Sequence, residues 1–296
     1  MAVGTNTHTV QSLSQYLDLI QDNLPVISDG FYTYRGERRS DWKIAPGIMR
    51  DQFANLLENE RHAVREIVSI HPNEFRDDHS MFDRLVRMQH FNLPTRLLDV
   101  TGNPLVALFN ATEEVDSRLD SPSDGRVYYI SIPDTRRKFY DSDAISCVAN
   151  LANLTAEEKA EILANMTVPF AAFNEVYDGL GSGIKAVDRL LQFIRMEKPS
   201  FRPLIKSKYL DRLWYVVPKL SNRRIIAQNG AFLIFGLTDR PNIPESQEPI
   251  QFRGIVIPAN RKREIRKSLA TLGITESALF PEIDKAAGFI VEKYRQ

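Results

Sequence analysis

Residues 89–104 set strongly polar side chains among aliphatic ones, a density that is unusual in a segment that otherwise resembles core. The segment reads QHFNLPTRLLDVTGNP, so an amide, an imidazole, a guanidinium and a carboxylate lie among apolar residues. Its leucines and valine favour burial and draw Arg96 and Asp99 toward low dielectric. Because a buried charge is costly unless it is paired and hydrogen-bonded, these groups must either pair with one another or receive a charged ligand.

Four separated motifs occur in order along the chain. The first two are Tyr34-Arg35-Gly36 and a block made of Gln89-His90, PTRLLD at 94–99 and Thr101. The last two are RIIAQNGAF at 224–232, and Gly273-Ile274 followed by LFPEID at 279–284. Together they resemble the FRG domain family, which is named for an aromatic-Arg-Gly triplet. The resemblance runs from about residue 28 to 290 and implies a single FRG-like domain.

Composition limits the classes of ligand and the location of the protein. Lysines plus arginines and aspartates plus glutamates both number 38, so no overall field favours nucleic acid or a membrane surface. An anion site must therefore be local. The single cysteine, Cys147, excludes an internal disulfide and fits a reducing compartment. With no signal peptide and no long apolar run in view, we expect a soluble cytoplasmic protein without membrane contact.

Strands are sparse early in the chain and frequent late, which favours an α+β fold over a doubly wound parallel sheet. We expect a mixed or antiparallel sheet core with flanking helices, a helical insertion at about 134–212, and an amphipathic helix within residues 1–27 packed on the single domain 28–296. Apolar periodicity and capping signals predict the elements. Helices are expected at 9–22, 51–70, 80–90, from 103, from 155, 184–194 and 260–272, and strands at 31–34, 126–132, 213–217, 231–237 and 254–257.

Arg35 and Arg96 are the candidate anion-binding residues. A guanidinium matches phosphate oxygens with a fork of donors, and Gly36 next to Arg35 has no Cβ to keep a ligand away from the backbone. Each arginine also has a structural interpretation. Arg35 would pair with Asp99, Glu60 or Glu37, and Arg96 would pair with Asp99 three residues on if that stretch is helical.

His90 is the best candidate for a general acid or base, or for a contact with ribose. In one interpretation Asp99 orients His90 or Arg35 from behind, because a carboxylate fixes the direction of an imidazole. In the other, His90 is an ordinary core or surface residue. The remaining histidines show no metal-ligand spacing, so no metal is expected.

Glu282 is the late acidic candidate, since it follows Phe280-Pro281. It would either stabilise a cation in a site or serve the N-terminus of a helix, where carboxylates are favourable in any case. Gln228 would contact a ligand edge or complete a turn. Further residues expected to bind the ligand belong to the same motifs and are Tyr34, Gly36, Gln89, Thr95, Asp99 and Thr101.

Anion-binding arginines, a neighbouring histidine and glutamine, and a distant acid suit a nucleotide that carries a diphosphate. The early Tyr-Arg-Gly strand is similar to the first-strand arginine motif of one branch of ADP-ribosyltransferases, although their Glu-x-Glu pair on a late strand is not found. This resemblance implies that NAD is the substrate, that the arginines hold its phosphates, that His90 and Gln89 position ribose or nicotinamide, and that Glu282 stabilises the ribosyl cation.

Two other classes of function remain open. One is a metal-independent nuclease or RNA-processing enzyme with His90 as the base. The other is a nucleotide sensor without catalysis that acts on a regulatory partner. The acceptor of a transferred group, protein or nucleic acid, is not encoded in any motif. FRG-type domains further suggest a toxin or an antiviral defence effector.

Overall fold

The computed structural model describes residues 8–22, 24–114, 122–180, 182–220, 222–238, 250–281 and 294. Within these ranges eight strands form one sheet in the order β1-β8-β4-β2-β3-β7-β6-β5. The strands are β1 His8–Thr9, β2 Gly30–Glu37, β3 Leu97–Thr101, β4 Gly125–Pro133, β5 Arg137–Phe139, β6 Trp214–Val217, β7 Gly230–Ile234 and β8 Gln251–Ile257.

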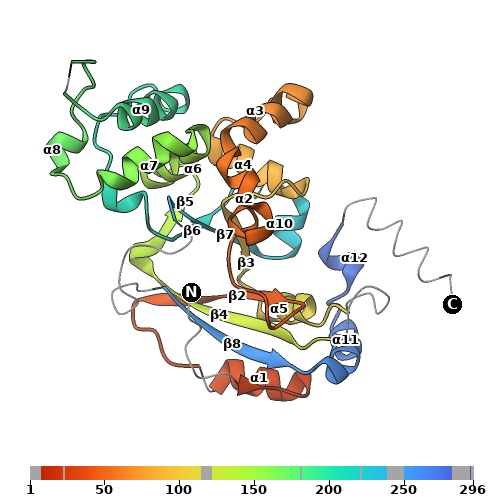
Figure 1. The fold of residues 1–296 in the computed structure, drawn as a ribbon. Helices are drawn as coiled ribbons and strands as arrows, with labels where there is room; N and C mark the ends of the chain where they lie inside the picture. Colours follow the sequence, from red (N-terminus) through yellow and green to blue (C-terminus); the bar gives the residue numbers. More distant parts are fainter. Residues whose placement is uncertain are drawn as a thin grey trace.

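The sheet is mixed and consists of two halves. Its neighbouring strands are antiparallel except for β1 with β8 and β5 with β6, which are parallel. Strand β2 pairs with β4 along its whole length, whereas β2 and β3 pair at a single position, Tyr34 with Thr101. Beyond that position the halves run in different directions (Figure 1). The expected α+β fold with a mixed sheet is confirmed.

Helices cover the outer face of each half. Helices α1, α5 and α11 pack on the half that contains β2, and α4, α6 and α9 pack on the half that contains β3. The helices are α1 Leu13–Asp22, α2 Ala54–Glu58, α3 Glu60–Ile70, α4 Met81–His90, α5 Pro104–Ala111, α6 Asp143–Ala149, α7 Ala156–Ala164, α8 Phe170–Phe173, α9 Lys185–Glu197, α10 Arg223–Ala227, α11 Lys262–Thr271 and α12 Glu276–Leu279. None of them, within the residues given above, has the length and apolar character needed to cross a membrane.

Local signals placed several helix ends correctly. Ser80 accepts a hydrogen bond from the Asp83 N–H at the start of α4, and Asn103 caps α5 with Pro104 in its first turn. Thr155 and Glu158 form the complete capping box of α7. Each of these interactions joins residues at most three positions apart, so the sequence alone predicts them.

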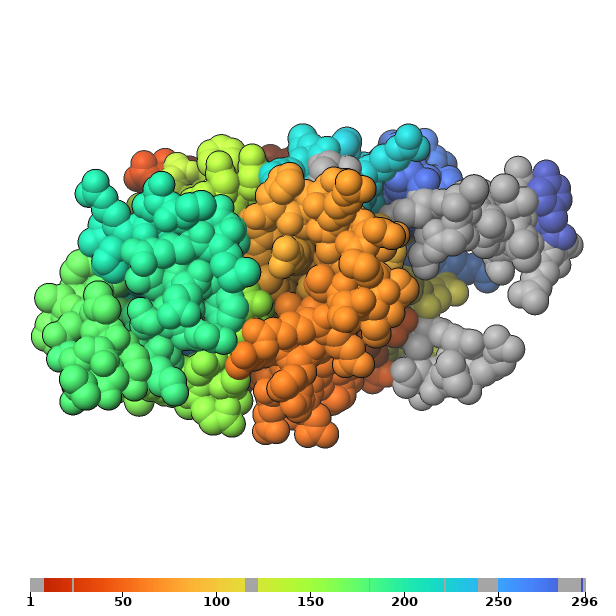
Figure 2. Space-filling model, turned by 90° about the horizontal axis from the view of Figure 1, so that it is seen from above, coloured from red at the N-terminus to blue at the C-terminus, as the bar shows by residue number. Residues whose placement is uncertain are grey.

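Three expectations about secondary structure were wrong in detail. The helix expected over 51–70 is broken at Asn59 into α2 and α3, after a 3-10 turn at Asp51–Phe53. The segment that starts at Arg224, for which no helix was expected, forms α10 before β7. The segment 134–212 contains α6 to α9 but also β5, which pairs with β6. Viewed from above, the green and teal atoms of this segment lie beside the orange atoms of the region that contains α2 to α4 (Figure 2).

Candidate functional site

The site lies where the two halves of the sheet separate. Past the Tyr34–Thr101 pair, the Arg35 side chain spans the gap between β2 and β3. Its Nη1 donates to the Asp99 carbonyl oxygen at 2.7 Å, and its Nε donates to Glu37 Oε1 at 2.7 Å. The guanidinium therefore provides a hydrogen bond to β3 where the backbone of β2 has moved away.

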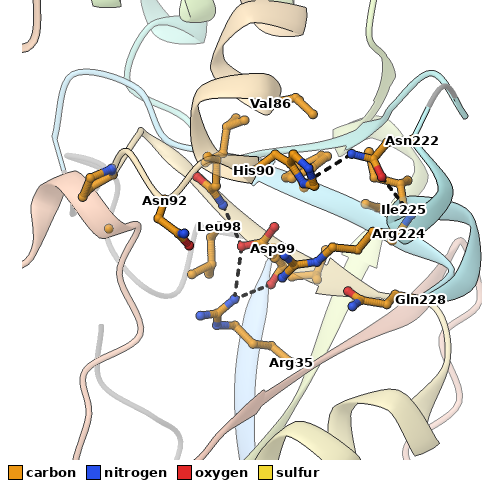
Figure 3. Close-up of a pocket in the computed structure, with 18 of the residues that line it drawn as sticks. Arg35, Val86, His90, Asn92, Leu98, Asp99, Asn222, Arg224, Ile225 and Gln228 are labelled. Carbon is orange, nitrogen blue, oxygen red and sulfur yellow. Dashed lines mark hydrogen bonds and ion pairs between the residues drawn. The ribbon is translucent and has the colours of Figure 1, made fainter. Parts of the chain in front are cut away.

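A cavity of about 290 Å³ opens beside this guanidinium, between β3, the end of α4, and α10 (Figure 3). Residues from four separate segments of the chain line it, which is typical of a binding site that the tertiary fold assembles. Its polar lining residues are Arg35, Arg50, Gln89, His90, Asn92, Asp99, Asn222, Arg224 and Gln228.

A chain of hydrogen bonds fixes the carboxylate in the cavity. The Thr95 hydroxyl donates to Gln89 Oε1 at 2.6 Å, and Gln89 Nε2 donates to Asp99 Oδ2 at 2.6 Å. Both ends of the Gln89 amide are therefore occupied, and its orientation is set by its partners. The Asp99 side chain remains 58% exposed and lines the cavity. Gln89 and Thr95 thus position the Asp99 carboxylate. Among the described residues that line the cavity, Asp99 is the one with a carboxylate.

Three guanidinium groups line the same cavity. Arg35 is 4.0 Å from the Asp99 carboxylate, and Arg50 Nη2 is 3.5 Å from Glu37 Oε1. Burial, and in smaller part the charge of Arg35, lower the pKa of Arg50 despite Glu37. Arg224 has its guanidinium carbon 4.9 Å from the Phe280 ring centre, and no carboxylate among the described residues lies within salt-bridge distance of it. Asp99 in the lining and Glu37 behind it are two carboxylates against three guanidiniums, so the cavity has an excess positive charge.

His90 lines the cavity, but its partner is not the expected one. Its Nδ1 lies 3.4 Å from Asn222 Nδ2, and its ring meets Phe91 edge-on with 5.2 Å between the ring centres. Asp99 instead contacts Gln89 and Arg35. Of the two partners proposed for Asp99, Arg35 is the one that lies beside it, bonded to its carbonyl oxygen and 4.0 Å from its carboxylate.

Arg96 does not share the cavity with Arg35, and its expected roles in phosphate binding and in an ion pair with Asp99 must be corrected. Its side chain is 1% exposed and bonds Glu60 through Nε and Nη2. Its Nη1 donates to the carbonyl oxygens of Phe235 at 3.0 Å and Gly236 at 2.7 Å. The stretch is a strand rather than a helix, so Asp99 points elsewhere.

Lys159 of α7 completes this buried cluster by donating to Glu60 Oε2 at 2.6 Å. Burial would raise the pKa of Glu60, but the charges and hydrogen bonds of Arg96 and Lys159 outweigh it and lower the pKa. The cluster ties the helical insertion to α3 and to the start of β3. All three guanidinium nitrogens of Arg96 are hydrogen-bonded within the protein, so none of them is available to a ligand.

The expected role of Gly36 also needs correction. A Cβ at this position would lie 1.9 Å from the Ala107 carbonyl oxygen and 2.7 Å from the Ala111 nitrogen. Gly36 therefore allows α5 to approach β2 and makes no room for a ligand. Tyr34, whose side chain alternates with that of Arg35 along β2, is buried in the core against α5 and does not line the cavity.

Thr101 and Gln228 link β3, at the base of the cavity, to the segments before α5 and after α10 and to α12. The Thr101 hydroxyl donates to the Gln228 carbonyl oxygen at 2.5 Å and accepts from the Asn103 N–H at 2.9 Å, so it is occupied by the backbone. Gln228 lines the cavity, and its Nε2 donates to the Leu279 carbonyl oxygen at 3.1 Å. Glu282, three residues further on, lies outside the described residues.

Sequence reasoning missed Arg50, Asn92, Asn222 and Arg224. Arg224 begins the third motif, so its position was a usable signal, but Gln228 was the residue of that motif chosen as a candidate. Asn92 has a φ of 64° and follows α4, a place where asparagine is common. Arg50 and Asn222 belong to no motif, and only the fold reveals them.

Residues 31–119 match the FRG domain. This range covers the strand with Arg35, the block at 89–101 and helix α5, but not the later motifs at 224–232 and 273–284. No curated protein and no solved structure matches the chain. On the strength of this match, the chain contains an FRG domain at residues 31–119.

Proposed function

We propose that the cavity binds the phosphates of a nucleotide and that the protein is an ADP-ribosyltransferase-like or NAD-cleaving enzyme. The observation that carries the proposal is the convergence of Arg35, Arg50 and Arg224 from three distant segments on one cavity. Two of the guanidiniums have donors available for an anion. Arg35 Nη2 has no hydrogen-bond partner within the described ranges, and the guanidinium of Arg224 contacts the Phe280 ring and forms no ion pair with another described residue.

The roles of the side chains follow from charge and position. The guanidiniums neutralise the diphosphate, for which their planar forks are suited. The Asp99 carboxylate lies in the same cavity and stabilises the positive charge that develops on ribose as the bond to nicotinamide breaks and nicotinamide leaves with the electron pair. His90 then takes the proton of the nucleophile, which is water or an acceptor group. In this proposal Asp99 takes the role that the sequence suggested for Glu282.

The test is release of nicotinamide from NAD by the purified protein. Arg224→Ala is the sharpest variant, because its guanidinium forms no ion pair that holds the described fold together. We expect wild type to release nicotinamide and Arg224→Ala to lose at least tenfold in rate at subsaturating NAD, as expected for one charge-assisted hydrogen bond. Arg261→Ala is the matched control. Arg261 pairs with Glu264 on the surface, with 3.1 Å between the charged atoms, and it does not line the cavity.

The outcomes separate the classes of function. Saturable nucleotide binding without nicotinamide release would contradict the enzyme and leave a nucleotide-binding protein. Metal-independent cleavage of RNA that is lost in His90→Ala would contradict the use of NAD. A toxin or defence role would require that expression lowers cellular NAD and arrests growth, and that Arg224→Ala relieves both effects.

A further inference from the structure

A second cavity, of about 510 Å³, adjoins the candidate site. The two share part of their lining, because Val86, His90 and Asn222 belong to both. One wall of the second cavity is a face of α4, where residues 83, 86, 87 and 90 have the spacing of helical neighbours. The opposite wall is formed by Pro218, Lys219, Asn222 and Arg223, the last of which begins α10.

The charges of the second cavity are already paired. Arg87 forms a two-point pair with Asp78, at 2.6 and 2.9 Å, and Lys219 bonds Asp83 at 2.8 Å. The other charged lining residues, Asp77 and Arg223, are exposed and have opposite signs. The candidate site, in contrast, has an excess positive charge. A phosphate is thus favoured in the first cavity, and an uncharged group is favoured in the second.

An aromatic ring is available in the second cavity. Phe91 directly follows α4, and its side chain is 51% exposed. Asn92, in the left-handed conformation, turns the chain immediately after it. As a result Phe91 lines the second cavity while Asn92 lines the first. Heterocyclic bases stack on exposed aromatic rings of this kind.

We propose that the second cavity is a base subsite, in which the planar heterocycle of the bound nucleotide packs against Phe91 while its phosphates lie among Arg35, Arg50 and Arg224. This inference rests on the proposed function. The His90 imidazole and the Asn222 amide stand on the shared wall between base and phosphate, where the ribose hydroxyls fall. A volume of about 510 Å³ is ordinary for a small-molecule site.

The experiment compares ligands with and without a base. Calorimetric titration would measure the dissociation constants of ADP, nicotinamide mononucleotide and inorganic pyrophosphate for wild type, Phe91→Ala and Phe91→Trp. We expect Phe91→Ala to weaken at least one nucleotide on the order of tenfold and to leave pyrophosphate unchanged. Phe91→Trp should restore the affinity, and its fluorescence should be quenched by the same nucleotide. Phe170→Ala is the control, because Phe170 is a similarly exposed phenylalanine, 48%, on the distant helix α8.

Each result has one consequence. Whichever nucleotide loses affinity identifies the base that enters the subsite. Equal affinity of all three ligands for wild type, or an equal loss of nucleotide and pyrophosphate in Phe91→Ala, would overturn the base subsite and leave the phosphate cavity standing. A wild-type protein that binds none of the three and releases no nicotinamide would overturn the subsite and the proposed function together.

Discussion

Arg96 and Arg35 lie close to the same short strand, Arg96 directly before β3 and Arg35 across its middle, and each pairs with a glutamate. Arg96 has all three nitrogens bonded inside the protein, to Glu60 and to two carbonyl oxygens. Arg35 bonds Glu37 and the Asp99 carbonyl, and its Nη2 remains without a partner in the described part of the chain. The Arg35 side chain is also more exposed, 16% against 1%.

The difference shows that ion pairing alone does not separate a structural arginine from a binding one. What separates them is whether the geometry leaves donors that face solvent. A buried pair is costly to form and still more costly to break, so the Arg96 cluster has no reason to open for a ligand. The pair at Arg35 lies at the edge of a cavity, where an anion can be added without the loss of an existing bond.

The largest effect is expected from Glu60→Gln. The substitution leaves Arg96 and Lys159 buried without a countercharge, and the loss of one partner of a buried pair costs about 3–5 kcal/mol of unfolding free energy. Urea unfolding would measure it. The control is Asp41→Asn, because the Asp41 carboxylate is 63% exposed in its pair with Arg39, and such pairs contribute less than about 1 kcal/mol. Similar losses in both variants would remove the distinction between the two kinds of pair.

Gly36→Ala tests whether the residue next to Arg35 serves folding or the ligand. The added Cβ would lie 1.9 Å from the Ala107 carbonyl oxygen, so α5 must move, and we expect a loss of about 1–3 kcal/mol in unfolding free energy. Gly230→Ala, whose nearest neighbour would be at 3.4 Å, should be tolerated. A variant of normal stability that no longer binds ADP would return Gly36 to the ligand site.

Lysine substitutions at the two arginines should affect different properties, ligand binding at Arg35 and stability at Arg96. Lysine keeps the charge but loses the fork. Arg35→Lys should weaken ADP binding about tenfold and lower the unfolding free energy by less than about 1.5 kcal/mol. Arg96→Lys should leave ADP binding unchanged in the folded fraction and lower the unfolding free energy by about 2–4 kcal/mol. Calorimetry and urea unfolding on the same preparations would check both, and parallel losses in the two variants would contradict the assignment.

The smallest effect concerns pH. The pKa of Glu60 is lowered in the folded protein from its ordinary value of 4.5, so the folded state holds this proton less tightly than the unfolded state. The ion cluster therefore contributes stability above pH 4.5, and that contribution is lost as the pH falls through the lower, folded-state pKa. Thermal melting from pH 7 to pH 3 should show this loss in wild type. Glu60→Gln should lack that component, and curves of the same shape in both proteins would exclude Glu60 as its source.

The extent of prediction from sequence varied with the distance between partners along the chain. Helix starts at Ser80, Asn103 and Thr155 were correct because their capping bonds are local. The α+β class was correct because apolar periodicity reports on each element by itself. The placement of Arg35 and Asp99 in one cavity followed from their motifs. Arg50 was missed because its partner Glu37 lies 13 residues before it, beyond the reach of a local pattern.

The sequence by itself determined which side chains need a partner. Charges at Arg96 and Asp99 set among leucines had to be neutralised somewhere, and the sequence said so without showing how. Only the tertiary structure decided which of them are satisfied within the protein. Glu60 lies 36 residues before Arg96, and Phe235 lies 139 residues after it, and no local pattern encodes such contacts. The packing of distant segments closed one arginine into the core and left the other at the edge of a cavity.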